Sequence, residues 1–100
     1  MAHIGKLTLK EDGTYEGSLQ TLKVRCDLRM VPCENASEKH PVYRIYSGRI
    51  ELGAAWENVA NETGLVYYTI RLNDPSFPAP LYAKLFQDKD DGGILHIVFD

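Results

Sequence analysis

A chain of 100 residues is long enough for one hydrophobic core but not for two, so we expect a single domain over residues 1–100. Hydrophobic residues make up 44% of the chain and charged residues 25%, which excludes the intrinsically disordered and collagen-like classes. The formal net charge of −3 disfavours a strongly basic nucleic-acid-binding protein, although it leaves room for a local basic patch.

The sequence carries no sign of export or of membrane insertion. No apolar run approaches the roughly 18 residues that a membrane-spanning helix needs, and charged side chains interrupt the opening segment, where a signal peptide would be apolar. We therefore expect a cytoplasmic location, in which Cys26 and Cys33 stay reduced. Their spacing matches neither a C-x-x-C redox pair nor a zinc knuckle. Cys26 is in phase with apolar neighbours and is expected to fill the core.

Apolar and polar residues alternate along most of the chain, which is typical of half-buried strands. The alternation begins in Ile4–Lys10 and resumes at Tyr15, and the turn signal Glu11–Asp12–Gly13 between them predicts a β-hairpin. The clearest strand is predicted at Leu22–Met30. Its apolar side is Leu22, Val24, Cys26, Leu28 and Met30.

The middle of the chain continues as strands separated by loops. Pro32–Pro41 is predicted to be a polar loop and Val42–Ser47 a strand with Tyr43 and Ile45 on one side. Past Gly48 the apolar positions shift by one, which favours a β-bulge or a bend at that glycine. The shifted apolar positions are Ile50, Leu52, Ala54 and Trp56, and this phase places Trp56 in the core.

The last third of the chain predicts three more apolar runs: Val66–Leu72, Leu81–Phe86 and Ile94–Phe99. A turn at Asn61–Gly64 precedes the first, and the second is compatible with a strand or a short helix. The whole pattern predicts an all-β antiparallel meander of six or seven strands, as a bent sheet or an open barrel. Exposed edges of such a sheet would leave the protein a monomer or an edge-paired homodimer.

The segment Asn73–Pro80 contains three prolines and is predicted to be a surface loop. Two interpretations of it stand side by side. It is a proline-rich recognition segment, or it is a loop that Phe77 and Tyr82 clamp onto the sheet, with prolines that reduce the entropy lost on folding. We prefer the second.

Three segments carry a family resemblance: Met1–Gly5, Leu52–Glu57 and Leu72–Ala83. Together and in this order they resemble the small bacterial proteins grouped as domain of unknown function 736 (DUF736), which are typical of proteobacterial plasmids and integrative elements. The resemblance covers nearly the whole chain. It implies a cytoplasmic accessory protein of mobile DNA, and it implies no reaction, because it brings no established catalytic residues.

The residues that could support catalysis or metal binding do not form a recognisable motif. His3, His40 and His96 stand in no nucleophile motif, and an enzyme would need a pocket that joins His96 or His40 to a carboxylate. The acidic run Asp88–Asp91 lacks the closing glutamate of a calcium loop and is expected to be a solvated hairpin tip. We therefore expect a protein that is not an enzyme, with no catalytic residues, no cofactor and no metal.

One surface stands out if the strands at 22–30, 43–47 and 66–72 share a sheet. Their outward positions then combine cations with aromatic rings, and Asp27 is the one acid among them. These candidate partner-binding residues are Lys23, Arg25, Arg29, Arg44, Tyr46, Tyr67 and Arg71. The same composition also occurs on ordinary solvated faces of antiparallel sheets.

The sequence thus favours a non-enzymatic binding module that docks a macromolecular partner through this basic and aromatic face, with no membrane contact. The partner is a protein or protein complex, which the resemblance narrows to a conjugation or replication component or a host defence complex. The alternative is a single-stranded nucleic-acid-binding protein that uses the same face. The loop Asn73–Pro80 is another possible contact surface, and the acidic tip Asp88–Asp91 would suit imitation of nucleic acid.

Overall fold

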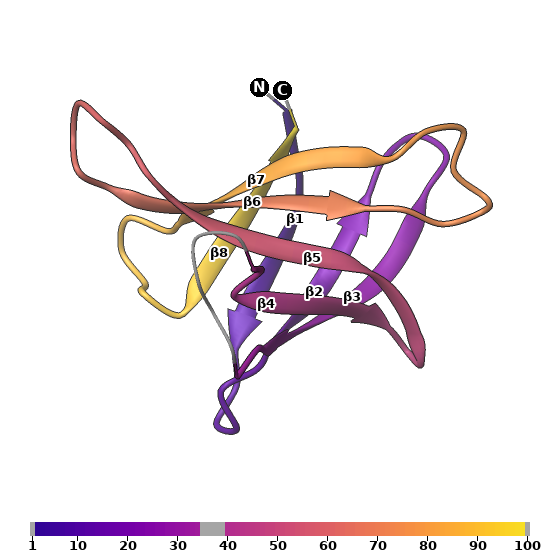
Figure 1. The fold of residues 1–100 in the computed structure, drawn as a ribbon, viewed down its shortest axis with the longest axis horizontal. Helices are drawn as coiled ribbons and strands as arrows, with labels where there is room; N and C mark the ends of the chain where they lie inside the picture. The colour runs from indigo at the N-terminus through magenta and orange to yellow at the C-terminus, as the bar shows by residue number, and fades with distance from the viewer. Residues whose placement is uncertain (1, 35–39, 100) are drawn as a thin grey trace.

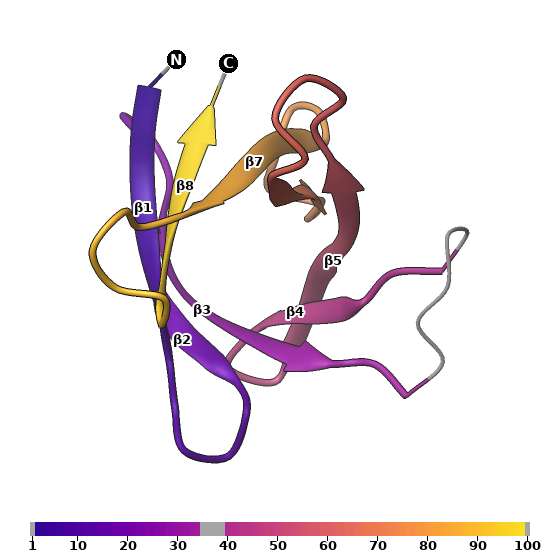
Figure 2. The ribbon, with the colours of Figure 1, turned by 90° about the vertical axis from the view of Figure 1, so that its left-hand side faces the viewer.

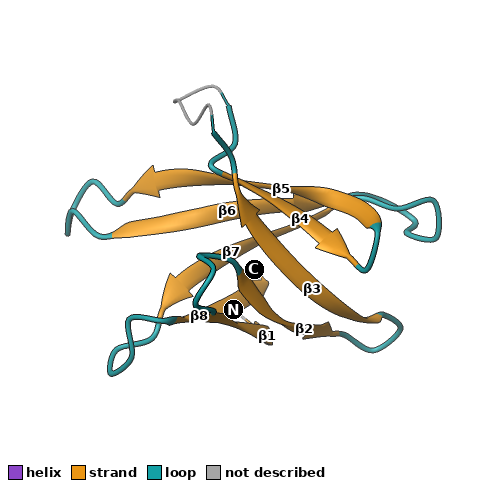
Figure 3. Ribbon diagram, turned by 90° about the horizontal axis from the view of Figure 1, so that it is seen from below, coloured by secondary structure: helices purple, strands orange, loops and turns teal. Residues whose placement is uncertain are grey.

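The computed structural model describes residues 2–34 and 40–99, and they form a closed antiparallel β-barrel (Figures 1 and 2). Each strand pairs with the next one along the chain, and β8 pairs back onto β1. The eight strands are β1 (Ala2–Leu9), β2 (Tyr15–Gln20), β3 (Arg25–Pro32), β4 (Tyr43–Ser47), β5 (Ile50–Val59), β6 (Val66–Leu72), β7 (Leu81–Gln87) and β8 (Ile94–Phe99). Figure 3 shows strands joined only by loops, and no described residue is helical.

The all-β meander is confirmed, whereas the expected six or seven strands become eight. Leu81–Phe86, for which the sequence left a helix open, lies in β7. Closure comes from the pairing of the two ends of the chain, from Ala2 opposite Phe99 to Thr8 opposite Ile94. Every strand therefore has a neighbour on both sides, and the expectation of a monomer or an edge-paired homodimer stays a prediction.

The core is built from the inward side chains of all eight strands. Most are branched aliphatic residues, which pack well on a pleated surface. The fully buried members are Leu7, Leu19, Met30, Ile45, Ile70, Leu72, Leu85 and Ile97. Cys26 packs against this core and is half-buried, as expected.

Three tyrosines extend the core. Tyr43 packs edge-to-face against Tyr15 and Tyr68, with ring centroids 5.9 and 5.6 Å apart. Burial, together with the neighbouring Tyr68, raises the pKa of Tyr43 to about 12. The tyrosine hydroxyls therefore stay neutral at physiological pH.

The strand predicted at Leu22–Met30 begins later than expected. Pairing of β2 with β3 ends at Gln20 opposite Arg25, and residues 21–24 reverse the chain. Thr21 closes this turn, because its N–H donates to the carbonyl of Val24 and its hydroxyl accepts the Val24 N–H. Leu22 is consequently 98% exposed. The prediction that Leu22 lies on the buried side of a strand is therefore wrong.

The prediction that Trp56 lies in the core is also wrong. The shift in register is at Leu52 rather than at Gly48, since Glu51 is opposite Tyr46 while Gly53 is opposite Ile45. The extra residue is a β-bulge, and it reverses the side that each later residue faces. Gly53 then faces the interior, whereas Trp56 lies opposite Thr69 on the outside and is half-exposed.

The loop at residues 73–80 contains no strand or helix, as predicted. Phe77 packs against the core, which confirms half of the clamp that the sequence suggested. Tyr82 is 57% exposed and does not take part in it. The loop expected at Pro32–Pro41 includes residues 35–39, which lie outside the described part of the chain. No helix in the described part is long and apolar enough to cross a membrane.

Two inward glycines allow neighbouring strands to approach closely. A Cβ added at Gly17 would lie 1.8 Å from the carbonyl oxygen of Lys6, and one at Gly53 would lie 1.7 Å from that of Arg71. Neither oxygen can move without breaking the sheet, because both belong to backbone. Glycine at these positions therefore lets the barrel curve tightly.

We expect Gly53→Ala and Gly17→Ala each to lower the free energy of unfolding by at least about 1–3 kcal/mol, the usual cost of overpacking. Urea denaturation measures the loss. Gly93→Ala is the matched control, since its Cβ would come no closer than 3.4 Å to Asp91 Oδ1. Equal losses in all three variants would contradict the close-approach argument.

Candidate functional site

The three strands of the predicted surface do share one sheet, but β5 lies between β4 and β6. The candidate residues therefore fall into groups rather than one row. The inserted strand contributes Ala54 and Trp56 to the same outer surface. Trp56 was missed because its phase was taken from the wrong side of the bulge.

The first group, here called the central patch, consists of Arg29, Arg44, Tyr46, Trp56 and Arg71. Arg29 is opposite Tyr46, and its guanidinium carbon lies 5.8 Å from the centre of the tyrosine ring. This is a cation–π distance. Arg44 and Arg71 flank Ala54 from the two neighbouring strands.

A shallow depression of about 270 Å³ lies within the central patch. Its lining residues are Arg44, Glu51, Leu52, Gly53, Ala54, Trp56 and Arg71. Arg44 donates to Glu51 over 2.8 Å, and both side chains are about half exposed, at 54% and 51%. A pair this exposed contributes little to stability, so Arg44 can exchange Glu51 for another anion.

The second group, here called the Tyr67 cluster, lies on β6 and β7. Tyr67 stacks on Phe86 with ring centroids 5.5 Å apart and an interplanar angle of 22°. The Lys84 ammonium lies 5.8 Å from the centre of the Tyr67 ring. Lys84 and Phe86 were missed because the run at residues 81–86 was not assigned a face. Their alternation with Ala83 and Leu85 could have revealed it.

Two predicted residues lie apart from both groups. Lys23 is in the turn between β2 and β3, and Arg25 is the first residue of β3. On the outward side of β3, Asp27 separates Arg25 from Arg29. The structure thus brings together Arg29, Arg44, Tyr46 and Arg71, places Tyr67 in its own cluster, and leaves Lys23 and Arg25 outside.

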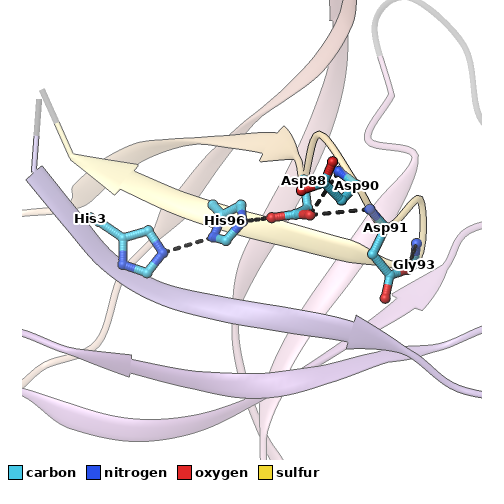
Figure 4. Close-up of polar contacts among 6 residues, drawn as sticks. All are labelled: His3, Asp88, Asp90, Asp91, Gly93 and His96. Carbon is cyan, nitrogen blue, oxygen red and sulfur yellow. Dashed lines mark hydrogen bonds and ion pairs between the residues drawn. The ribbon is translucent and has the colours of Figure 1, made fainter.

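A chain of contacts between titratable side chains crosses the seam where the barrel closes (Figure 4). His3 Nε2 lies 2.9 Å from His96 Nδ1, and His96 Nε2 lies 2.6 Å from Asp88 Oδ1. The other carboxylate oxygen of Asp88 accepts the backbone N–H groups of Asp90 and Asp91. The chain thus connects β1, β8 and the β7–β8 loop.

This arrangement joins His96 to a carboxylate, which is what the enzyme alternative required. Both ring nitrogens of His96 are already engaged, however, so the ring has none left to accept a proton from a nucleophile. His40 is exposed in the β3–β4 loop, where it lines a depression of about 440 Å³ together with Glu34 and Cys33. Among the described residues no group of three or more His, Cys, Asp or Glu side chains is placed to hold a metal ion. The contacts of His3, His96 and Asp88 connect β1, β8 and the loop before β8, and this group is here called the clasp.

A family model described as a protein of unknown function (DUF736) matches residues 3–100. The chain belongs to the DUF736 family. This confirms the resemblance seen in the sequence motifs. No curated protein and no solved structure matches this DUF736 member.

The clasp predicts a pH dependence of stability. The hydrogen bond to His96, followed by that to the Asp90 N–H, lowers the pKa of Asp88 below its ordinary value of 3.8. A lowered pKa means that the carboxylate stabilises the fold fully above its unfolded-state value and loses this effect as the pH falls through the folded-state value. Asp88→Asn should therefore be less stable than wild type near about pH 6, and the difference should shrink as the pH falls below the ordinary value of 3.8 and through the lowered folded-state pKa.

Urea denaturation across this pH range measures the difference. Asp90→Asn is the matched control, because it removes the same charge from the same loop and leaves the His96 contact in place. A difference between Asp88→Asn and wild type that stays constant with pH would show that the charged form of Asp88 does not stabilise the barrel.

Proposed function

We propose that this chain is a non-enzymatic binding module that docks a macromolecular partner through the central patch and the Tyr67 cluster. The observation that carries the proposal is the contact of cations with aromatic rings on adjoining outer strands, Arg29 with Tyr46 and Lys84 with Tyr67. Arginine, tyrosine and tryptophan are the residues in which binding energy usually concentrates at interfaces.

The distribution of charge supports the same surface. β4, β6 and β7 contain no Asp or Glu, and on β5 between them Glu51 is paired with Arg44, although the chain as a whole carries a net charge of −3. Each of these strands has one cation: Arg44, Arg71 and Lys84. A basic surface on an acidic protein orients an anionic partner toward one side of the barrel.

The resemblance to the DUF736 family suggests where the partner is found. Because proteins of this family are typical of plasmids and integrative elements, we expect the partner to belong to a mobile genetic element or to its host, in the bacterial cytoplasm. A conjugation or replication component and a host defence complex are the protein partners that this setting suggests. Single-stranded nucleic acid is the second candidate.

A specific observation favours the second candidate. Trp56, Tyr67 and Phe86 are all half-exposed, and cations lie beside them at positions 44, 71 and 84. Single-strand-binding surfaces combine rings on which bases stack, worth roughly 1–3 kcal/mol per base, with Lys and Arg for the phosphates. The three surface residues that the sequence did not predict are also aromatic or cationic. They are Trp56, Lys84 and Phe86.

Fluorescence anisotropy of labelled single- and double-stranded oligonucleotides tests the nucleic-acid candidate. We expect saturable binding of single strands that weakens steeply with salt, because phosphate contacts release counterions. Arg29→Ala combined with Tyr67→Ala should weaken binding at least about tenfold. Lys10→Ala, in the turn after β1, removes a cation away from the surface and should change affinity little.

Absence of oligonucleotide binding at low salt would exclude the second candidate and leave the protein partner. The protein partner is then sought by affinity capture with wild type and with Arg29→Ala/Tyr67→Ala, followed by reconstitution with the purified partner. Partners retained equally by both forms of the bait would contradict the proposed docking surface.

A further inference from the structure

The depression in the central patch has a more specific composition than the surface around it. Arg44 and Arg71 face each other across Ala54, and Trp56 is two residues further along the same outward side of β5. Neighbouring strands are about 4.8 Å apart, so the Cα atoms of the two arginines are separated by about 10 Å. Both guanidinium groups can reach a single anion above Ala54.

We propose that this depression holds one nucleotide of a single-stranded nucleic acid, with its phosphate between Arg44 and Arg71 and its base stacked on Trp56. The inference rests on the proposed function and names the contact that recognises the partner. Arginine binds phosphate through two parallel hydrogen bonds. Residues 54 and 56 are about 6.6 Å apart along the strand, a spacing comparable to that between the phosphate and the base of one nucleotide.

The small side chain of Ala54 explains why this depression, here called the nucleotide seat, exists. Ala54 lines the depression, and a larger side chain at position 54 would fill the space between the two arginines. Ala54 is 9% exposed because the longer side chains around it cover it. The β-bulge at Leu52 puts Ala54 and Trp56 on the outer surface together.

Glu51 limits the affinity of the seat. Arg44 Nη1 donates a hydrogen bond to the Glu51 carboxylate, and an incoming phosphate must displace this carboxylate. Because the pair is exposed, the displacement costs little. A phosphate gains from two arginines, whereas Glu51 is paired with only one.

The test uses the intrinsic fluorescence of Trp56, which is the one tryptophan in the chain and therefore reports on this site alone. Single-stranded oligothymidylate is titrated into the full chain, with the duplex of the same length as the comparison. We expect saturable quenching by the single strand, with a midpoint that matches the anisotropy titration. Arg71→Gln should raise the oligothymidylate concentration at the midpoint about tenfold. It should also reduce the slope of log affinity against log salt concentration by about one.

Two further variants examine the seat itself. Ala54→Glu puts a carboxylate between the arginines and should weaken binding at least about tenfold, while Gln20→Glu adds the same charge at the end of β2, away from the seat, and should not. Glu51→Gln frees Arg44 and should strengthen binding about twofold to fivefold. This gain of affinity cannot come from a variant that fails to fold.

The failure of the inference differs from the failure of the proposed function. Oligothymidylate that binds by anisotropy without quenching Trp56, or with equal affinity for Ala54→Glu and Gln20→Glu, would overturn the nucleotide seat and leave the Tyr67 cluster as the contact. No binding in either assay at low salt overturns the seat together with the nucleic-acid candidate. The docking surface would then be examined with a protein partner.

Discussion

Closure of the barrel through β1 and β8 is the constraint on which the rest of the structure depends. The two strands come from opposite ends of the chain, so all the intervening strands must curve to bring them together. That curvature places Gly17 and Gly53 where a Cβ would strike the neighbouring backbone. The clasp of His3, His96 and Asp88 connects β1 and β8 and reaches the loop before β8.

The order of the strands separates the seam from the central patch. In a ring of eight strands, β4 and β5 lie across the barrel from β8 and β1. The central patch is therefore on the side away from the clasp. A partner on the patch contacts strands held by the interior of the barrel, whose packing keeps Arg44, Arg71 and Trp56 in fixed relative positions on β4, β6 and β5. Rigid elements of this kind are better supports for a binding site than loops are.

The sequence predicts the strands well because apolar alternation is a local signal. It also finds Arg29, Arg44, Tyr46, Tyr67 and Arg71 on the outside, since each lies in phase with polar neighbours along a regular strand. Closure could not be predicted, because the pairing of Ala2 with Phe99 depends on the curvature accumulated by the whole sheet.

The bulge is the other feature that local pattern conceals. Leu52 and Ala54 are both apolar and in phase, so the sequence treats them as members of one face. The extra residue at Leu52 sends Leu52 to the core and Ala54 to the outer surface. A slip of one residue therefore places Trp56 on the outer surface rather than in the core. The family resemblance could be stated from motifs alone because it does not depend on register.

The acidic residues of the β7–β8 loop complete the contrast with the basic strands. Imitation of nucleic acid would require carboxylates that project toward a partner. Asp88 instead binds His96 and the backbone of its own loop, and Asp91 accepts the N–H of Gly93. The carboxylates of Asp88 and Asp91 thus stabilise the loop between β7 and β8, and this loop positions β8 for its pairing with β1. The cations of β4, β6 and β7 are the charges on which the proposed docking of an anionic partner rests.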